Sequence, residues 1–271
     1  MIYVRFHGRY GLSNRIRAMA GCYALSRMLN EEFVFSWEYD DSCPGEFDEI
    51  FESSIAGFPV QSSHHNLLSS TSRIYIHAES SPTACGCTPE AIFNRYLEGG
   101  FSQSIFYSFV DEFYKNLLPE KKIAQRVNDF WSRHQLETKN VIGVHIRRTD
   151  MLDHIKSRSL EPVSDDNLWR AIDSKLNNDA SINIFAAADN PLSISEIKLR
   201  YGDKVLSNEV VWNLDLEKAA NDSKKQARLT SIQDSIFDLY ALSKCDVIIG
   251  TKNSSFSSFA SLWGSVPLVK E

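Results

Sequence analysis

A run of apolar, mostly β-branched residues, Val141 to Ile146, leads directly into two arginines and limits the kind of sheet this chain can form. Such a run indicates a strand that is buried on both faces, as in the centre of a parallel sheet. Similar runs at Ile182 to Ala188 and Asp246 to Gly250 are each followed by a helical pattern. Strands that alternate with helices in this way predict an α/β fold with parallel sheets.

The alternation extends over the rest of the chain. Residues 3–6 and 33–37 are expected as strands, and residues 14–29 and 194–201 as helices, because their apolar side chains recur at the matching period. Pro119 breaks the helical pattern between two helices. We therefore expect an N-terminal domain over residues 1–118 and a C-terminal domain over residues 119–271.

Composition excludes several classes of protein. The net charge of the 271-residue chain is −6 and no long basic run occurs, which argues against binding of nucleic acid. No segment approaches the roughly 18 consecutive apolar residues of a membrane span. The chain has five cysteines, an odd number in a long chain, which favours a reducing, cytoplasmic location over a disulfide framework.

One short cysteine pair, Cys85-Gly86-Cys87, suggests a metal site. No second pair of cysteines or histidines lies nearby at the spacing of a zinc site, so we expect no metal here.

The most informative segment follows the strand at Val141 to Ile146. It places His145, Arg147, Arg148 and Asp150 at the carboxyl end of a strand, where open α/β sheets bind their ligands. Two guanidinium groups suit a diphosphate, because arginine binds phosphate in bidentate fashion. A structural Arg–Asp pair would explain one arginine and the aspartate but not the other two residues, so we favour a binding site.

Two further strand ends carry polar residues. Asp189 follows the strand at residues 182–188, although Asp189 or Asn190 could simply cap the next helix. After Gly250, a serine-rich turn opens a helix whose free N–H groups suit a phosphate. The residues of this turn that we single out are Ser254, Ser255 and Phe256.

Two other segments offer polar side chains. Asp234 and Asp238 lie one helical turn apart, and a carboxylate there could accept hydrogen bonds from guanine. Near the N-terminus, a glycine-bearing turn carries Arg9, Gly11 and Asn14, although Asn14 could instead cap the following helix.

Missing motifs also carry information. The chain has no Asp-x-Asp, Walker A, HExxH or GxSxG motif. Transfer from a nucleotide sugar requires the charge of the departing diphosphate to be stabilised, by a metal or by positioned cations and helix N-termini. This sequence offers the second set and not the first.

The pattern resembles the superfamily of α1,2- and α1,6-fucosyltransferases and protein O-fucosyltransferases, and looks closest to the α1,6 branch. The His-x-Arg-Arg-x-Asp signature of that superfamily is matched by residues 145–150, and its Ala-[Thr/Ser]-Asp-[Asp/Asn] signature by residues 187–190. Its third signature is matched by Asp238, Leu242, Ser243, Cys245, Asp246, Ser254 and Ser255.

The resemblance implies a GT-B-like fold of two Rossmann-like domains facing a cleft, with the acceptor on the N-terminal domain and GDP-fucose mainly on the C-terminal one. It implies an inverting, metal-independent hexosyltransferase that passes fucose to a hydroxyl of a glycan or another acceptor and needs no cofactor beyond its donor substrate. Arg147 would stabilise the leaving diphosphate, supported by Arg148 and His145. Asp238 would bind guanine, and the Ser254/Ser255 backbone would bind phosphate. Asn14 and Arg9 would face the sugar.

The sequence departs from the family where the α1,6 branch places a lysine and then an acidic residue, since Met151 and Ile155 stand near those positions. The general base is therefore open between Asp153 and His154, either of which can accept a hydroxyl proton. Two alternatives also stay open: the same fold acting on a different nucleotide sugar, and a non-catalytic module that binds nucleotide sugars or glycans.

Overall fold

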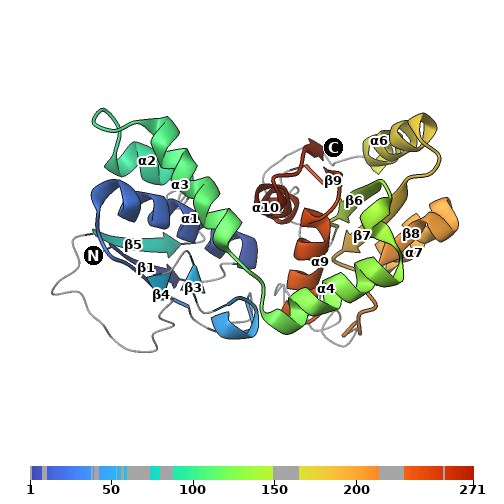
Figure 1. The fold of residues 1–271 in the computed structure, drawn as a ribbon, viewed down its shortest axis with the longest axis horizontal. Coiled ribbons are helices and arrows are strands. Elements are labelled where there is room, and N and C mark those ends of the chain that lie inside the picture. Colours follow the sequence, from blue (N-terminus) through green and yellow to red (C-terminus); the bar gives the residue numbers. More distant parts are fainter. Residues whose placement is uncertain are drawn as a thin grey trace. The chain divides into compact units, whose positions relative to one another are not determined.

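The computed structural model describes residues 2–7, 11–37, 39, 43–52, 54–55, 58–59, 74–79, 88–148, 165–213, 229–252 and 254–271. The chain divides into two compact units, Met1–Lys121 and Lys122–Glu271 (Figure 1). Each unit contains a parallel sheet with helices packed against it.

The N-terminal unit is built on a three-stranded parallel sheet with strand order β2-β1-β5. Its strands are β1 (Ile2–His7), β2 (Phe33–Ser36) and β5 (Ile74–Glu79), with a small antiparallel pair, β3 (Ser54–Ile55) and β4 (Phe58–Pro59). Its helices are α1 (Leu12–Leu29), α2 (Pro89–Tyr96) and α3 (Gln103–Asn116), with a short 3-10 turn, η1 (Phe47–Glu49).

Helix α1 is the central helix of this unit. It begins after Gly11, which has extended backbone angles, and ends at Asn30 in the left-handed region with φ 51°. A Cβ on Gly21 would lie 2.7 Å from Ile92 of α2, so the glycine allows the two helices to pack closely. The alternative that Asn14 caps this helix is wrong, because the helix starts two residues earlier and Gly11 occupies the capping position.

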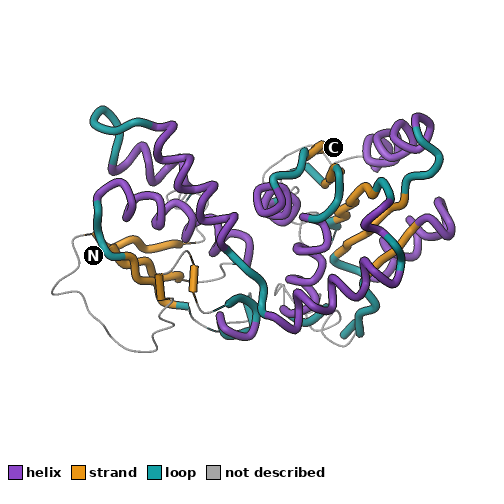
Figure 2. Tube along the Cα trace, viewed as in Figure 1, coloured by secondary structure: helices purple, strands orange, loops and turns teal. Residues whose placement is uncertain are grey.

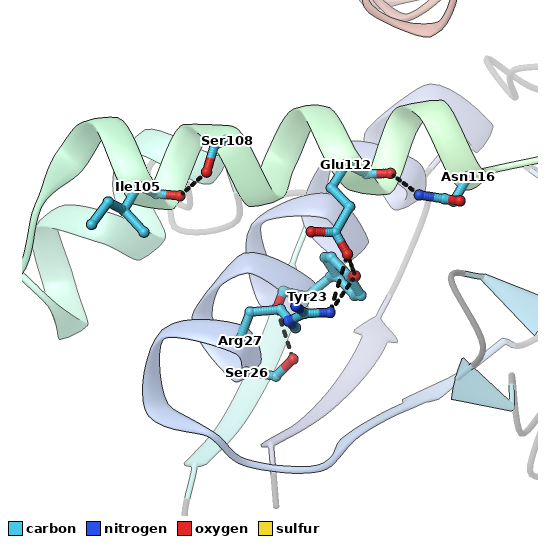
Figure 3. A network of polar contacts seen from close by, with 7 residues as sticks. All are labelled: Tyr23, Ser26, Arg27, Ile105, Ser108, Glu112 and Asn116. Carbon is cyan, nitrogen blue, oxygen red and sulfur yellow. Dashed lines mark hydrogen bonds and ion pairs between the residues drawn. The ribbon is translucent and has the colours of Figure 1, made fainter.

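A polar network joins α1 to α3 (Figure 3). The hydroxyl of Tyr23 donates to Glu112 Oε1 at 2.6 Å, and Arg27 Nη1 donates to the same oxygen at 3.1 Å. Burial, and then the hydrogen bond to Glu112, raise the pKa of Tyr23 to about 12. The protonated phenol is thus the form that the folded state favours.

The C-terminal unit contains a five-stranded parallel sheet with strand order β10-β9-β6-β7-β8. Its strands are β6 (Val141–Ile146), β7 (Asn183–Ala188), β8 (Val205–Ser207), β9 (Val247–Gly250) and β10 (Leu268–Lys270). Its helices are α4 (Lys121–Arg133), α6 (Asp165–Asn178), α7 (Pro191–Tyr201), α9 (Ile232–Ser243) and α10 (Ser255–Gly264), with 3-10 turns η3 (Leu136–Thr138) and η4 (Gly202–Lys204).

Strand β6 lies at the centre of this sheet, and all six of its residues are buried. Figure 2 shows the helices of the unit gathered around the strands. One face of the sheet packs on α6 and α7 through an apolar cluster that includes Val144 and Trp169. On the other face, Phe185 of β7 contacts Phe130 and Trp131 of α4. A central strand covered on both sides explains why the sequence shows a run of apolar residues instead of an alternation.

Two glycines let α10 approach its neighbours, β9 and α9, closely. A Cβ on Gly250, the last residue of β9, would lie 2.5 Å from Ser257 Oγ of α10. A Cβ on Gly264 would overlap the backbone carbonyl of Ser243 at the end of α9. The two helices therefore pack with almost no side chain between them at this point.

The α/β class with parallel sheets is confirmed. Helix α7 begins at Pro191, three residues before the start expected from its apolar pattern, because the Asn190 side chain caps it by accepting from Ser193 N at 2.9 Å. None of the helices in the described part of the chain is both long and apolar enough to cross a lipid bilayer.

We expect the Tyr23 network to make stability depend on pH in alkali. Because the folded pKa of Tyr23 is about 12 against an ordinary value of 10.0, its contribution is complete below pH 10 and is lost as the pH rises towards 12. Denaturant unfolding should show that the difference in the free energy of unfolding between wild type and Tyr23→Phe shrinks by about 1 kcal/mol over this range. We expect this modest value because solvent screens the partly exposed charges of Arg27 and Glu112. A pH-independent difference would contradict this account.

We also expect Gly264→Ala to destabilise the C-terminal unit. The added methyl group has to push α9 and α10 apart, and overpacking of this kind costs about 1–3 kcal/mol. Thermal unfolding should detect the loss. Gly100→Ala is the matched control, because a Cβ on Gly100 meets nothing within 4 Å. Equal stability of the two variants would show that the close approach is not required.

Candidate functional site

The candidate site of the C-terminal unit lies at the carboxyl ends of β6, β7 and β9, which meet at one edge of the sheet because the strands are parallel. Backbone bonds beyond the strands hold the three ends together. Thr251 N donates to His145 O at 3.2 Å, and Asp189 N donates to Ile146 O at 3.3 Å. The segment from His145 to Arg148 is thus fixed from both sides.

His145 is buried, with only 4% of its surface exposed. Its ring stacks on Phe256, with the ring centroids 4.7 Å apart and the planes inclined by 22°. Its Nδ1 atom lies 3.4 Å from Ser254 Oγ, which itself accepts from Phe256 N at 3.3 Å. The structure thus brings together three of the predicted residues, from β6 and from the start of α10.

Arg147 follows directly after β6, and its backbone is held by Thr251. Arg147 N donates to Thr251 Oγ1 at 3.1 Å, while the same hydroxyl donates to His145 O at 3.2 Å. The arginine is half-buried. The end of β9 therefore fixes where the Arg147 side chain leaves the sheet.

Arg148 is tied to β7 and α7. Its N–H donates to both carboxylate oxygens of Asp189, at 3.1 and 3.0 Å, and its Nη1 lies 2.5 Å from Glu196 Oε2. Asp189 also accepts from the Asn190 side chain at 2.9 Å. Asp189 thus holds the backbone after β6, while Asn190 is the residue that caps α7.

The Gly250 turn leads into α10, whose first turn has no acidic residue. Ser254 caps the helix, with its side chain accepting from Phe256 N, and is 1% exposed. Ser255 is the first residue of the helix and is half-buried. The positive end of the helix dipole is thus placed beside His145, where it favours a negatively charged group.

Asp238 lies on α9 with Asp234 one turn before it, as the spacing predicted. The Asp238 Oδ1 atom is buried and, among the described residues, has no hydrogen-bond partner. Burial, and then the charge of Asp234, raise the pKa of Asp238 well above its usual value, while a hydrogen bond from Asn208 and the charge of Arg126 oppose this. Asp234 differs, because Arg126 Nη2 donates to its Oδ1 at 2.9 Å.

The predicted residues of the N-terminal turn lie in the other unit. Gly11 caps α1, and a Cβ there would meet nothing within 4 Å. Asn14 is half-buried in the first turn of α1, and its Oδ1 accepts from Arg17 Nη2 at 3.0 Å.

Several predicted residues fall outside the described residues. They are Arg9, Asp150, Asp153 and His154, together with Cys85 and Cys87. The described cysteines, Cys22, Cys43 and Cys245, are all buried. Within the described ranges, no three His, Cys, Asp or Glu side chains are grouped so that they could hold a metal ion.

Sequence reasoning missed four residues that contact the predicted ones: Thr251, Glu196, Asn208 and Arg126. Thr251 and Asn208 follow β9 and β8 directly, so the rule that ligand sites lie at the carboxyl ends of strands could have found both. Glu196 and Arg126 lie within helices that carry no local signal of their contacts.

Comparison with known proteins adds a family and a fold. A search among curated proteins finds no matching sequence. The fucosyltransferase NodZ from Bradyrhizobium superposes with a TM-score of 0.57 at 15% identity, covering 99% of this chain and 94% of that chain. A mutant of Arabidopsis thaliana FUT1 in complex with GDP gives a TM-score of 0.60 at 10% identity, covering 99% and 70%. The apo form of POFUT1 gives a TM-score of 0.54 at 13% identity, covering 99% of this chain and 97% of that chain.

These structural matches confirm the expected GT-B-like fold. The family model of nodulation protein Z matches residues 108–269, which is more than half of the chain and includes the candidate site of the C-terminal unit. The chain therefore belongs to the nodulation protein Z (NodZ) family.

Proposed function

We propose that this glycosyltransferase of the NodZ family transfers fucose from GDP-fucose to a hydroxyl of a glycan or another acceptor, with inversion and without a metal ion. Similar proteins support the donor: NodZ α-1,6-fucosyltransferase has been crystallised with GDP and soaked with GDP-fucose, and POFUT1 has been crystallised with GDP-fucose. The two alternatives, another nucleotide sugar and a non-catalytic binding module, make different predictions below.

The observation that carries the proposal is the placement of Arg147. It leaves the end of the buried central strand with its backbone fixed by Thr251, next to the N-terminal end of α10. A guanidinium group and a helix N-terminus are both suited to the charge that develops on a leaving diphosphate. The Arg147 backbone and the helix N-terminus are both held in place by the fold, which favours stabilisation of charge in the transition state.

The two arginines take different roles in this proposal. The Arg148 side chain is paired with Glu196, and its backbone N–H donates to Asp189, so we assign Arg148 to supporting the backbone at the end of β6. Arg147 is assigned to the β-phosphate. Ser254 and Ser255 would offer backbone N–H groups to phosphate, while His145 and Phe256 form the buried wall beside them.

Asp238 is assigned to guanine. Its Oδ1 atom is buried without a partner among the described residues, which is costly unless a ligand supplies a donor. Guanine offers two neighbouring N–H donors, and a carboxylate accepts both. Uracil lacks this pair of donors, so Asp238 would also select the nucleotide.

The remaining assignments follow the same proposal. Gly11, Asn14 and Arg9 would contact the sugar end of the donor, and Asp150 would hold one of the two arginines in place. Asp153 or His154 would accept the proton of the acceptor hydroxyl. The N-terminal domain, residues 1–118, would hold the acceptor and residues 119–271 the donor.

A donor panel tests the nucleotide and the sugar together. Isothermal titration should show that wild type binds GDP and GDP-fucose more tightly than UDP-sugars. GDP-mannose shares the nucleotide of GDP-fucose, so a comparison of these two donors tests which sugar the protein prefers. Asp238→Asn should weaken GDP about 100-fold, because it leaves one guanine donor unmatched in a buried site. Asp234→Asn is the control on the same helix. Equal binding of UDP-sugars and GDP by wild type would favour the alternative donor.

Arg147→Ala should lower kcat for release of GDP in the presence of acceptor by about 10²–10³, with a smaller change in binding of GDP-fucose, because the lost interaction is strongest in the transition state. Arg200→Ala, which removes an exposed pair with Asp173, is the control and should leave kcat unchanged. Normal turnover by Arg147→Ala would refute the assigned role. Tight donor binding by wild type without any turnover would favour the non-catalytic module.

A further inference from the structure

An ion pair between α4 and α9, inside the C-terminal unit, is not used by the proposed mechanism. Arg126 of α4 donates from Nη2 to Asp234 Oδ1 at 2.9 Å. Its guanidinium carbon also lies 5.2 Å from the centroid of the Phe237 ring, which in turn contacts Phe130 of α4. Arg126 is therefore held against two residues of α9, and the second of them directly precedes Asp238.

The carboxylate of Asp234 has donors on both of its oxygens. Besides Arg126, Asn208 Nδ2 donates to Oδ1 at 3.4 Å, and Ser231 Oγ donates to Oδ2 at 2.6 Å. Asp234 thus needs no ligand to satisfy it. Its negative charge nevertheless lies one helical turn from Asp238, on the same face of α9.

The surroundings of Asp238 work against its ionised form. Burial, and then the charge of Asp234, raise the pKa of Asp238, whereas a hydrogen bond from Asn208 and the charge of Arg126 lower it. Strand β7 and helix α10 also pack against α9, and neither contains a charged residue. Within the described residues, Arg126 is therefore the cation that opposes these effects.

A structural role alone explains the pair poorly. The side chain of Arg126 is 45% exposed and that of Asp234 is 16% exposed. Ion pairs at such exposure contribute little to stability, because water screens them and the long arginine side chain loses entropy. The charge of Arg126 still acts on Asp238, whose Oδ1 atom is buried.

The charge state of Asp238 matters for a base. An ionised carboxylate only accepts, so its two oxygens can take both the N1–H and the 2-amino group of guanine. A protonated carboxyl group has turned one oxygen into a donor, and one of the guanine donors then meets another donor. Recognition of guanine through Asp238 therefore requires the ionised form.

We propose that Arg126 is a positioning residue for base recognition, which pairs with Asp234 and so allows Asp238 to meet guanine as a carboxylate. The inference rests on the proposed function, in which Asp238 binds guanine. Arg126 does not touch the base in this account. It acts by neutralising the neighbouring carboxylate, and Asp234 takes part only as the charge that has to be neutralised.

The test compares GDP with inosine diphosphate by isothermal titration over a pH series from about 5 to about 8, where a desolvated carboxyl group titrates. The two ligands have the same phosphates and the same N1–H, and inosine diphosphate lacks the 2-amino group. Their affinity ratio thus isolates base recognition from titration of the phosphates. Wild type should prefer GDP by about tenfold, the contribution of one hydrogen bond to a charged acceptor.

Arg126→Met removes the charge and keeps an unbranched side chain against the Phe237 ring. The pH below which the preference for GDP disappears should be higher in this variant than in wild type. At the lowest pH where wild type keeps its preference, Arg126→Met should lose about fivefold of it, since solvent weakens the influence of a half-exposed charge. Arg133→Met makes the same change at an exposed position of α4 and should leave the profile unchanged.

Two more variants separate charge from packing. Adding Asp234→Asn to Arg126→Met should restore the preference, because the charge that Arg126 neutralised is gone. A merely structural role predicts the opposite, since the second change disturbs the same contact further. Arg126→Lys keeps the charge and should retain most of the preference.

Identical pH profiles for wild type and Arg126→Met would overturn the inference, as would a double variant without recovery or a loss in Arg126→Lys equal to that in Arg126→Met. If wild type prefers GDP and Asp238→Asn abolishes the preference while Arg126→Met does not shift it, the assignment of Asp238 to guanine stands and only the role of Arg126 falls. If wild type binds both nucleotides equally at every pH, the guanine assignment fails and the inference fails with it.

Discussion

The burial of β6 on both faces is the constraint on which the C-terminal unit depends. Its six residues lie in the middle of the sheet between β7 and β9, covered by helices on each side. The start of the strand is fixed as firmly as its end, because Asp246 Oδ2 accepts from Val141 N at 2.7 Å. A strand held in this way brings the residues after Ile146 to one fixed place at the sheet edge, and the candidate site is assembled there.

Neighbouring strands then determine what each of the two arginines can do. Thr251 after β9 holds the backbone of Arg147, and Asp189 after β7 holds that of Arg148. Glu196 engages the side chain of Arg148, with 26% of the arginine side chain and 47% of the glutamate side chain exposed. At that exposure the ion pair adds little stability, so its main effect is to fix geometry. Two adjacent residues of one type therefore have distinct surroundings.

Helices α9 and α10 carry the other candidate residues of this unit, and glycines set their positions. Gly250 and Gly264 let α10 approach β9 and α9 at distances that no larger residue allows. This packing brings Ser254 and Phe256 against His145. On α9, the chemistry of two carboxyl groups one turn apart diverges, because Arg126 binds Asp234 while Asp238 is left in a desolvated position. Their different surroundings support the assignment of only one of them to a ligand.

The sequence alone determined the α/β class, the central buried strand and the residues that follow it, because burial on two faces and the two helical and strand periods are local properties of a chain. It also identified the edge of the sheet where polar residues gather. It did not determine which side chain each of them meets. Some contacts depend on how helices pack or on where a side chain points, as for Glu196, Arg126 and Arg17. The start of α7 depends on the Asn190 cap and not on an apolar pattern. Only the tertiary structure decides these contacts, since a charge has no preferred partner until packing fixes its neighbours and removes the water around them.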